Sequence, residues 1–191
     1  MAVTRDQNRR RGRRKLFGRD RRGSTAVEFA LVAPIFLTFM FSIFEVGWFF
    51  FANSIVDATV TSTGRVIRTG QIQKATGSDQ DKLDTLYDDI CDVVEVFGDC
   101  DTRLTLEVAT FTSFANLAAD TTAATCANAP PEDLAAIPFE TGGELEIVRV
   151  RVCFLYKTVN PAIGIKIAEA GTSYRRIVST MIFRNEPYES N

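Results

Sequence analysis

The sequence predicts an α+β protein in which a long N-terminal transmembrane helix precedes a small external domain with one helix and a three-stranded antiparallel sheet. Three patterns lead to this prediction: a membrane-length apolar run at residues 29–52, a helical apolar stripe at residues 79–97, and alternating apolar positions in three later segments. A chain of 191 residues has room for one anchor and one domain of modest size. We therefore divide it into a leader (1–23), a long helix (24–69) and an external domain (70–191).

The leader, residues 1–23, is strongly basic. It contains ten Lys or Arg and two acids, a net charge of +8, whereas the rest of the chain has 12 basic and 22 acidic residues, a net charge of −10. Basic segments beside a membrane helix stay in the cytoplasm, so we expect a cytoplasmic N-terminus and an extracytoplasmic domain from about residue 53. We expect no nucleic-acid partner, because neither aromatic residues nor a helical register accompanies the arginines.

The apolar run at residues 29–52 is 24 residues long, and about 20 residues span a bilayer core. A cleaved secretory signal has a shorter apolar core, of about 7–15 residues, and a soluble core helix rarely carries phenylalanine on every side. The stripe continues at helical spacing to residue 69, where Gly70 suits a helix C-terminus, and Pro34 predicts a kink. The sequence thus predicts a single-pass protein of the inner (cytoplasmic) membrane.

The external domain begins with a predicted loop at residues 70–78. Residues 79–97 repeat apolar side chains at helical spacing and place acids in the first turns, where the helix dipole favours them. Alternation predicts strands at residues 104–114, 144–159 and 171–183, and the composition of residues 115–143, rich in Ala, Thr, Asp, Asn and Pro, predicts a long loop. Three strands with short connections favour an antiparallel sheet packed by the helix.

All four cysteines lie in the external domain: Cys91, Cys100, Cys126 and Cys153. An even number on the oxidising side of a membrane predicts two disulfides. A zinc site is not expected, because the chain has no histidine and no Cys-x2-Cys spacing. Three pairings are possible, and we favour Cys91–Cys100 with Cys126–Cys153, since the first pair closes a short loop between a helix and a strand.

No sequence motif predicts an enzyme. The chain lacks histidine, a Gly-rich phosphate loop and a nucleophile elbow. The acids between residues 79 and 101 are best explained as a solvated helix face. We expect no cofactor, no metal and no small-molecule substrate.

Gly23, Ser24 and Glu28 form the most informative pattern of the chain, because they join the basic leader to the apolar run as in a type IV prepilin. Cleavage after Gly23 would make Glu28 the fifth residue of the new chain, close to a new cationic amine on Ser24. Pairing with this amine, in the same or a neighbouring subunit, would offset the high cost of an isolated charge in lipid. The alternative is a carboxylate at headgroup level that the helix dipole favours.

Glu45 is the second carboxylate of the apolar run, and two interpretations of it are equally open. It lies near the outer headgroups beside Trp48, a residue type that anchors helices at the membrane interface. Alternatively, it contacts the helix of a partner subunit, with Thr38 and Ser42 assisting.

The chain resembles the TadE-like pseudopilins, which are minor pilin-like proteins of the tight-adherence (Flp) pilus system. The resemblance rests on Gly23-Ser24 followed by Glu28-Phe29, on the membrane helix, and on the sequences GRVIRTGQ at residues 64–71 and RNEPY at residues 184–188. It covers the helix and the last strand well and the middle of the chain hardly at all. The larger TadG-like proteins share the helix but carry a bigger external domain.

This resemblance implies processing by a membrane aspartyl prepilin peptidase and a role in Flp pilus assembly with other pilin-like and assembly proteins. Gly23 and Ser24 would then be the processing residues, and Glu28, Phe29 and Glu45 the subunit-assembly residues. The alternative function is a permanently anchored extracytoplasmic binding module that recognises a partner through residues 115–143. A membrane-bound enzyme is the least favoured of the three.

Overall fold

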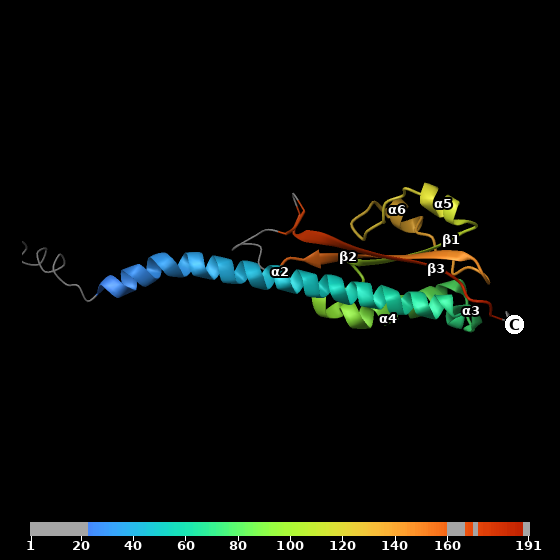
Figure 1. Cartoon of the computed structure of the whole chain (residues 1–191), viewed down its shortest axis with the longest axis horizontal. Coiled ribbons are helices and arrows are strands. Elements are labelled where there is room, and N and C mark those ends of the chain that lie inside the picture. The colour runs from blue at the N-terminus through green and yellow to red at the C-terminus, as the bar shows by residue number, and fades with distance from the viewer. Residues whose placement is uncertain (1–22, 160–166, 170–171, 189–191) are drawn as a thin grey trace, which may run out of the picture.

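The computed structural model describes residues 23–159, 167–169 and 172–188. The elements are α2 (Ser24–Arg68), α3 (Gln71–Lys74), α4 (Asp79–Val94), the 3-10 turn η2 (Glu95–Phe97), β1 (Leu104–Phe111), α5 (Phe114–Ala119), α6 (Pro131–Ala135), β2 (Ile147–Lys157) and β3 (Tyr174–Arg184). They form three layers, with α2 and α4 on one side of the sheet and α5 and α6 on the other (Figure 1). The α+β class is confirmed, whereas residues 1–22 of the predicted leader lie outside the described residues.

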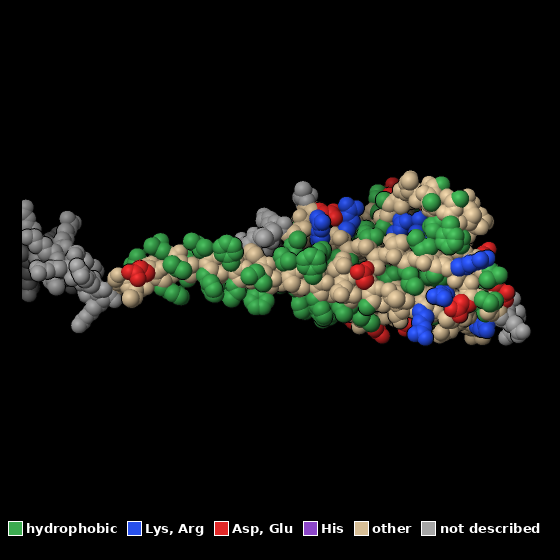
Figure 2. Space-filling view, viewed as in Figure 1, with side chains coloured by type: hydrophobic (Ala, Val, Ile, Leu, Met, Phe, Trp, Pro, Cys, Tyr) green, Lys and Arg blue, Asp and Glu red, His purple; other side chains and the backbone are tan. Residues whose placement is uncertain are grey.

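The helix α2 is 45 residues long and has two halves with different surroundings. From Gly23 to Phe41 every side chain is exposed or half-buried, and Ser42 is the first buried one. Apolar side chains cover this projecting half, whereas most charged side chains lie over the domain (Figure 2). By length and composition α2 is able to cross a membrane.

The second half of α2 supplies one wall of the hydrophobic core. Ala52, Val56, Val60 and Ile67 recur on one helix face and are fully buried against the inner face of the sheet. Gly64 lies where α2 crosses β3, and a Cβ atom there would come within 3.1 Å of the Phe183 ring. The glycine therefore sets how closely the helix lies on the strand.

The helix α4 returns along α2, as the helical stripe predicts. Its first turn has a capping box: the Ser78 side chain accepts a hydrogen bond from the N–H of Asp81, and the Asp81 carboxylate accepts one from the N–H of Ser78. Leu86, Ile90 and Val94 are buried. The predicted helical segment to residue 97 is completed by η2.

The sheet is antiparallel with the order β1-β2-β3, as expected. Its register pairs Leu106 with Val152 and Val150 with Met181. β1 ends at Phe111, three residues earlier than predicted, because the Ser113 side chain accepts a hydrogen bond from the N–H of Asn116 and starts α5.

The connections contain more structure than the sequence suggests. The predicted loop at residues 70–78 includes α3, and the long loop at residues 115–143 is interrupted by the short helices α5 and α6. The connection from β1 to β2 covers residues 112–146, so it is not short. It returns to cover the edge of β1, where the Val108 N–H donates to the Pro138 carbonyl and the Glu140 N–H donates to the Val108 carbonyl.

Candidate functional site

The predicted processing residues lie at the start of α2. Gly23 precedes the first residue of α2 with φ −99° and ψ 0°, a negative φ that residues with a side chain also adopt. A Cβ atom built on it would meet nothing within 4 Å in the described part of the chain. Neither backbone strain nor packing against described residues therefore requires a glycine at this position.

Glu28 is exposed, and its side chain folds back toward the first residue of α2. Its Oε1 accepts a hydrogen bond from the Ser24 hydroxyl at 3.0 Å. The first turn of α2 contains no acid and Gly23 provides no side-chain cap, so the unpaired N–H groups there have no nearer carboxylate within α2. The next residue, Phe29, is 73% exposed, as a side chain facing lipid or a neighbouring helix would be.

Glu45 is 4% exposed and lies under the end of β2. Both of its carboxylate oxygens accept hydrogen bonds from the N–H of Val159 at 3.1 Å, and Oε1 accepts one from the Tyr156 hydroxyl at 3.4 Å. Burial raises the pKa of Tyr156, and the negative charge of Glu45 raises it further. The structure thus gives Glu45 partners within its own chain, while contact with headgroups or a neighbouring subunit stays a prediction.

The predicted assembly residues do not form one cluster. Glu28 and Glu45 are 17 positions apart on the same helix, which is about 25 Å at 1.5 Å per residue. Each carboxylate therefore acts in a separate local environment, one at the start of α2 and one where the domain begins.

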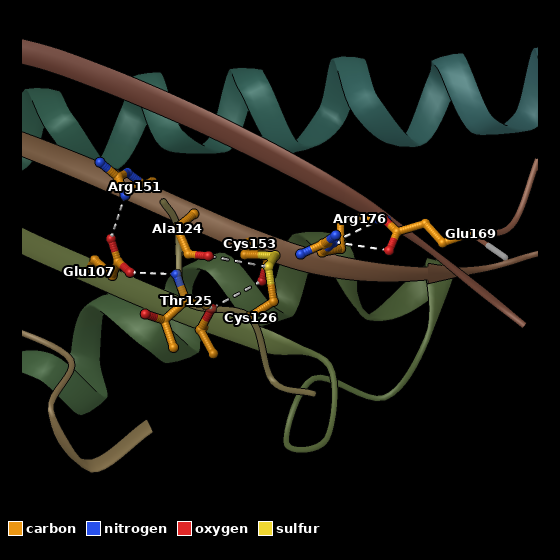
Figure 3. The surroundings of a disulfide bond; sticks show 9 residues. Glu107, Ala124, Thr125, Cys126, Arg151, Cys153, Glu169 and Arg176 are labelled. Carbon is orange, nitrogen blue, oxygen red and sulfur yellow. Dashed lines mark hydrogen bonds and ion pairs between the residues drawn. A yellow bond between two sulfur atoms is a disulfide. The ribbon is translucent and has the colours of Figure 1, made fainter. Parts of the chain in front are cut away.

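Both favoured disulfides are present, Cys91–Cys100 and Cys126–Cys153. The first joins α4 to the segment that leads into β1. The second fixes the β1–β2 connection to the outer face of the sheet (Figure 3). The two bridges thus hold elements on opposite sides of the sheet.

A buried ion pair lies beside the second disulfide. Glu107 accepts a hydrogen bond from the N–H of Thr125 at 2.7 Å and forms a salt bridge with Arg151 at 3.3 Å (Figure 3). Arg151 also donates to the Thr122 carbonyl at 2.9 Å. Because both charged side chains are over 90% buried, each depends on these partners.

A second pair holds the same connection. Asp120 lies 2.8 Å from Arg149, whose guanidinium lies 5.0 Å above the ring centre of Phe111. Hydrogen bonds from Thr122, followed by the contact with Arg149, lower the pKa of Asp120 to about 2. Neither pair was predicted from the sequence, where the usable signal is that both predicted strands carry charged residues among apolar ones; the register places Glu107 opposite Arg151.

Between this connection and the sheet lies an open hollow of about 820 Å³. Small and polar side chains dominate its walls, including Ala123, Ala124 and Asn128, and both carboxylates and arginines line it. Within residues 23–159, 167–169 and 172–188, no group of three or more His, Cys, Asp or Glu could hold a metal ion.

The two sequences that carry the family resemblance outside the membrane helix pack against each other. Gly70 has φ +74°, and a Cβ atom there would meet the Tyr188 ring at 2.6 Å. The Glu186 N–H donates to the Arg68 carbonyl at 2.9 Å, and the two side chains form a salt bridge at 3.1 Å. The Tyr188 hydroxyl donates to the Gly142 carbonyl at 3.0 Å. The C-terminal segment therefore fixes the end of α2.

No curated protein and no solved structure is significantly similar to the chain. A family model does match its N-terminal part, over residues 23–65. This segment contains Gly23, Ser24, Glu28, Phe29 and Glu45 and reaches the close contact between α2 and β3 at Gly64. The matched model is that of the TadE-like proteins, so residues 23–65 are similar to a TadE-like segment, which confirms the resemblance predicted from the sequence.

Proposed function

We propose that the chain is a pseudopilin of the tight-adherence (Flp) pilus, cut after Gly23 by a prepilin peptidase and then active in pilus assembly. The TadE-like match over residues 23–65 supports the assignment to the tight-adherence pilus system. The contact between Glu28 and Ser24 at the start of α2 supports a mechanism in which Glu28 pairs with the amine that cleavage creates. The role is structural, so the partners are the membrane, the peptidase and other pilin-like and assembly proteins.

The observation that carries the proposal is the direction of the Glu28 side chain. Its carboxylate already reaches the Ser24 hydroxyl at 3.0 Å. The backbone nitrogen of Ser24 belongs to the same residue as this hydroxyl, so the amine that cleavage would create would lie on the residue that the carboxylate already contacts. Burying the two charges together costs much less than burying either one alone. Before cleavage Ser24 has an amide nitrogen and no charge, so cleavage would switch the pairing on.

Gly23 completes this proposal. Nothing in the described structure requires a glycine there, and recognition by the peptidase would supply a physical reason for it. A residue without a side chain lets an extended backbone enter a protease cleft without crowding.

The membrane topology of the proposal follows from charge. The excess of +8 before α2 holds the N-terminus in the cytoplasm, and the external domain has the opposite net charge. Two disulfides suit an oxidising extracytoplasmic compartment. A reporter fused at Asn191 should therefore be active only outside the cytoplasm.

Intact-mass measurement on protein recovered from its native host tests the processing step. A mature chain of 191 − 23 = 168 residues beginning at Ser24 is the expected product. Gly23→Phe should leave the precursor of 191 residues uncut, whereas the matched control Gly23→Ala, which adds one small group in open space, should still be cut. Recovery of the full-length chain from wild-type cells with an active peptidase would contradict the proposal.

One observation favours the alternative function, a permanently anchored binding module. The hollow of about 820 Å³ beneath the β1–β2 connection has the size of a ligand site. A module of this kind has no use for cleavage, so the same mass measurement separates the two functions.

A further inference from the structure

Exposed apolar side chains from three elements meet at one level along α2, where the domain begins. We call this set the collar, and its members are Phe44, Trp48, Phe51, Val96 and Val159. Val96, the middle residue of η2, and Val159, two residues beyond the end of β2, are 68% and 67% exposed. The collar is separate from the start of α2 and from the hollow on the outer face of the sheet.

Contacts establish that the members share one level. The ring of Phe97, next to Val96, lies 5.4 Å from Trp48 and 5.7 Å from Phe51. On the other side of α2, the backbone N–H of Val159 donates to Glu45. Both the α4–η2 end and the β2 end of the domain are therefore attached to the same two turns of α2.

The length of the free helix indicates what the collar contacts. Residues 24–41, which project beyond the domain, are 18 residues or about 27 Å long. A bilayer core is about 30 Å thick and its outer polar region adds several Å on each side. A helix that spans this core therefore brings the base of the domain against the outer leaflet.

The apolar run of the sequence agrees with this geometry. It continues to Ala52, ten residues beyond Ser42, where the domain begins to cover α2. Over this stretch of about 15 Å, Phe44 and Phe51 remain exposed on the side that the domain leaves open.

We propose that the collar rests in the interfacial region of the outer leaflet, so that lipid covers Val96 and Val159 as well as α2. Trp48, half-exposed at this level, is a residue type enriched at such interfaces. Glu95 and Asp99, on either side of Val96 and Phe97, are exposed and keep the contact shallow, because carboxylates remain among hydrated headgroups. The function of the contact is orientation: it fixes the tilt and height of the domain relative to the membrane before the subunit is extracted for assembly.

Lipid fits the collar better than a second copy of the chain does. The apolar surface of the projecting helix continues onto the base of the domain (Figure 2), and the collar residues on α2 belong to this continuation of the apolar run. A protein partner would instead match an apolar patch that extends along the domain. Phe114 and Leu145, which are also exposed, lie on other elements, whereas Val93 on α4 precedes Val96 by three residues and is 46% exposed.

Tryptophan fluorescence tests the proposal, because Trp48 is the only tryptophan of the chain. In a Trp48→Phe background, single tryptophans are placed by Val96→Trp in the collar, Phe36→Trp in the projecting helix and Leu145→Trp at the distal end. All three sites are exposed, so the larger ring fits without repacking. The full chain is reconstituted in phosphatidylcholine vesicles whose acyl chains carry bromine either near the headgroup or near the chain end, since bromine quenches indole on contact.

The collar tryptophan should lose most of its emission to the shallow bromines and little to the deep ones. Phe36→Trp should be quenched by the deep bromines, and Leu145→Trp by neither. Val159→Trp repeats the measurement on the β2 side, so misfolding of one variant does not decide the outcome.

The proposal rests on the proposed function, in which α2 spans the membrane. The Phe36→Trp variant reports insertion of α2, so it distinguishes a failure of the collar contact from a failure of insertion. A quenched Phe36→Trp with unquenched collar tryptophans overturns the collar contact and leaves the proposed function standing. Unquenched collar tryptophans with blue-shifted emission would identify a protein partner or a second copy as the occupant and also reject lipid. If Phe36→Trp is not quenched either, insertion fails, and with it both the proposed function and the collar contact.

Discussion

Removing the Cys126–Cys153 disulfide should destabilise the external domain more than removing Cys91–Cys100. The first bridge closes a segment with a sequence separation of 27 and the second a segment with a separation of 9. A cross-link lowers the entropy of the unfolded chain by an amount that grows with the logarithm of the loop length, so the expected losses in free energy of unfolding are about 3.6 and about 2.6 kcal/mol.

The folded state should survive the loss of the longer bridge. The segment around Cys126 is also held by the buried pair Glu107–Arg151 and by the contact of Asp120 with Arg149. These contacts remain when the sulfur–sulfur bond is absent. The change in stability should therefore arise mainly in the unfolded chain.

The assay compares two matched double variants, Cys126→Ala/Cys153→Ala and Cys91→Ala/Cys100→Ala, as full chains in detergent with urea as denaturant. The emission of Trp48, which lies 5.4 Å from Phe97, and far-ultraviolet circular dichroism report the transition. With an unchanged urea dependence, the midpoints should fall in the order wild type, short-loop variant, long-loop variant. If the short-loop variant is destabilised as much as the other or more, the chain-entropy reasoning is refuted. Before reduction the wild-type chain should take no alkylating label, and after reduction four.

Three further predictions follow from the carboxylates and from Tyr87. Glu28→Ala should still insert and be cut, because removal of a charge makes membrane residence easier, but electron microscopy should find no pili; normal pili would show that the carboxylate has no role in assembly. Glu45→Leu should lower the free energy of unfolding by about 1–3 kcal/mol, because the Val159 N–H and the Tyr156 hydroxyl lose their acceptor, and Glu45→Gln, which keeps one oxygen, should lose less; equal losses would contradict the hydrogen bonds. Burial, assisted by neighbouring aspartates, raises the pKa of Tyr87 from 10.0 to about 12, so its stabilising contribution is present below pH 10 and is lost as the pH rises toward 12. Urea midpoints across this interval should fall more for the wild type than for Tyr87→Phe, and parallel curves would argue against the shift.

The parts of the fold that depend on local pattern were predictable from the sequence. Helical spacing predicted α2 and α4, and alternation predicted the three strands, because both periods follow from the geometry of the element itself. The even number of cysteines predicted two disulfides, and the shortest closed loop indicated the pairing that the structure contains. The helices α5 and α6 were missed because each is only one to two turns long and has little periodic signal.

Long-range contacts were beyond the sequence for a different reason. Alternation predicts that Arg149 and Arg151 share one face of β2, but both faces of an antiparallel strand are possible sites for charge. The structure buries both arginines because the β1–β2 connection folds back over that face with Asp120 and the carbonyl of Thr122 as partners. Likewise, Glu45 finds its partner Val159 at a separation of 114 residues, and no local pattern marks such a pair.

The position of Glu45 follows from the two environments of α2, which are lipid around the projecting half, as proposed, and the protein core around the second half. Hydropathy does not distinguish a side chain that faces lipid from one that faces a protein core, so the apolar run continues without interruption past the point where the domain begins. A carboxylate is tolerated there only if protein donors replace water, and the Val159 N–H, just beyond the end of β2, and the Tyr156 hydroxyl supply them. In the projecting half of α2, by contrast, the described domain provides no donor, and a carboxylate needs a partner on its own helix or on another subunit. Glu28 lies in that half, and among the residues that the structure describes its hydrogen-bond partner is Ser24. If cleavage creates the proposed amine on Ser24, the same rule would make Glu28 the carboxylate that pairs with it, whereas Glu45 is held within the domain.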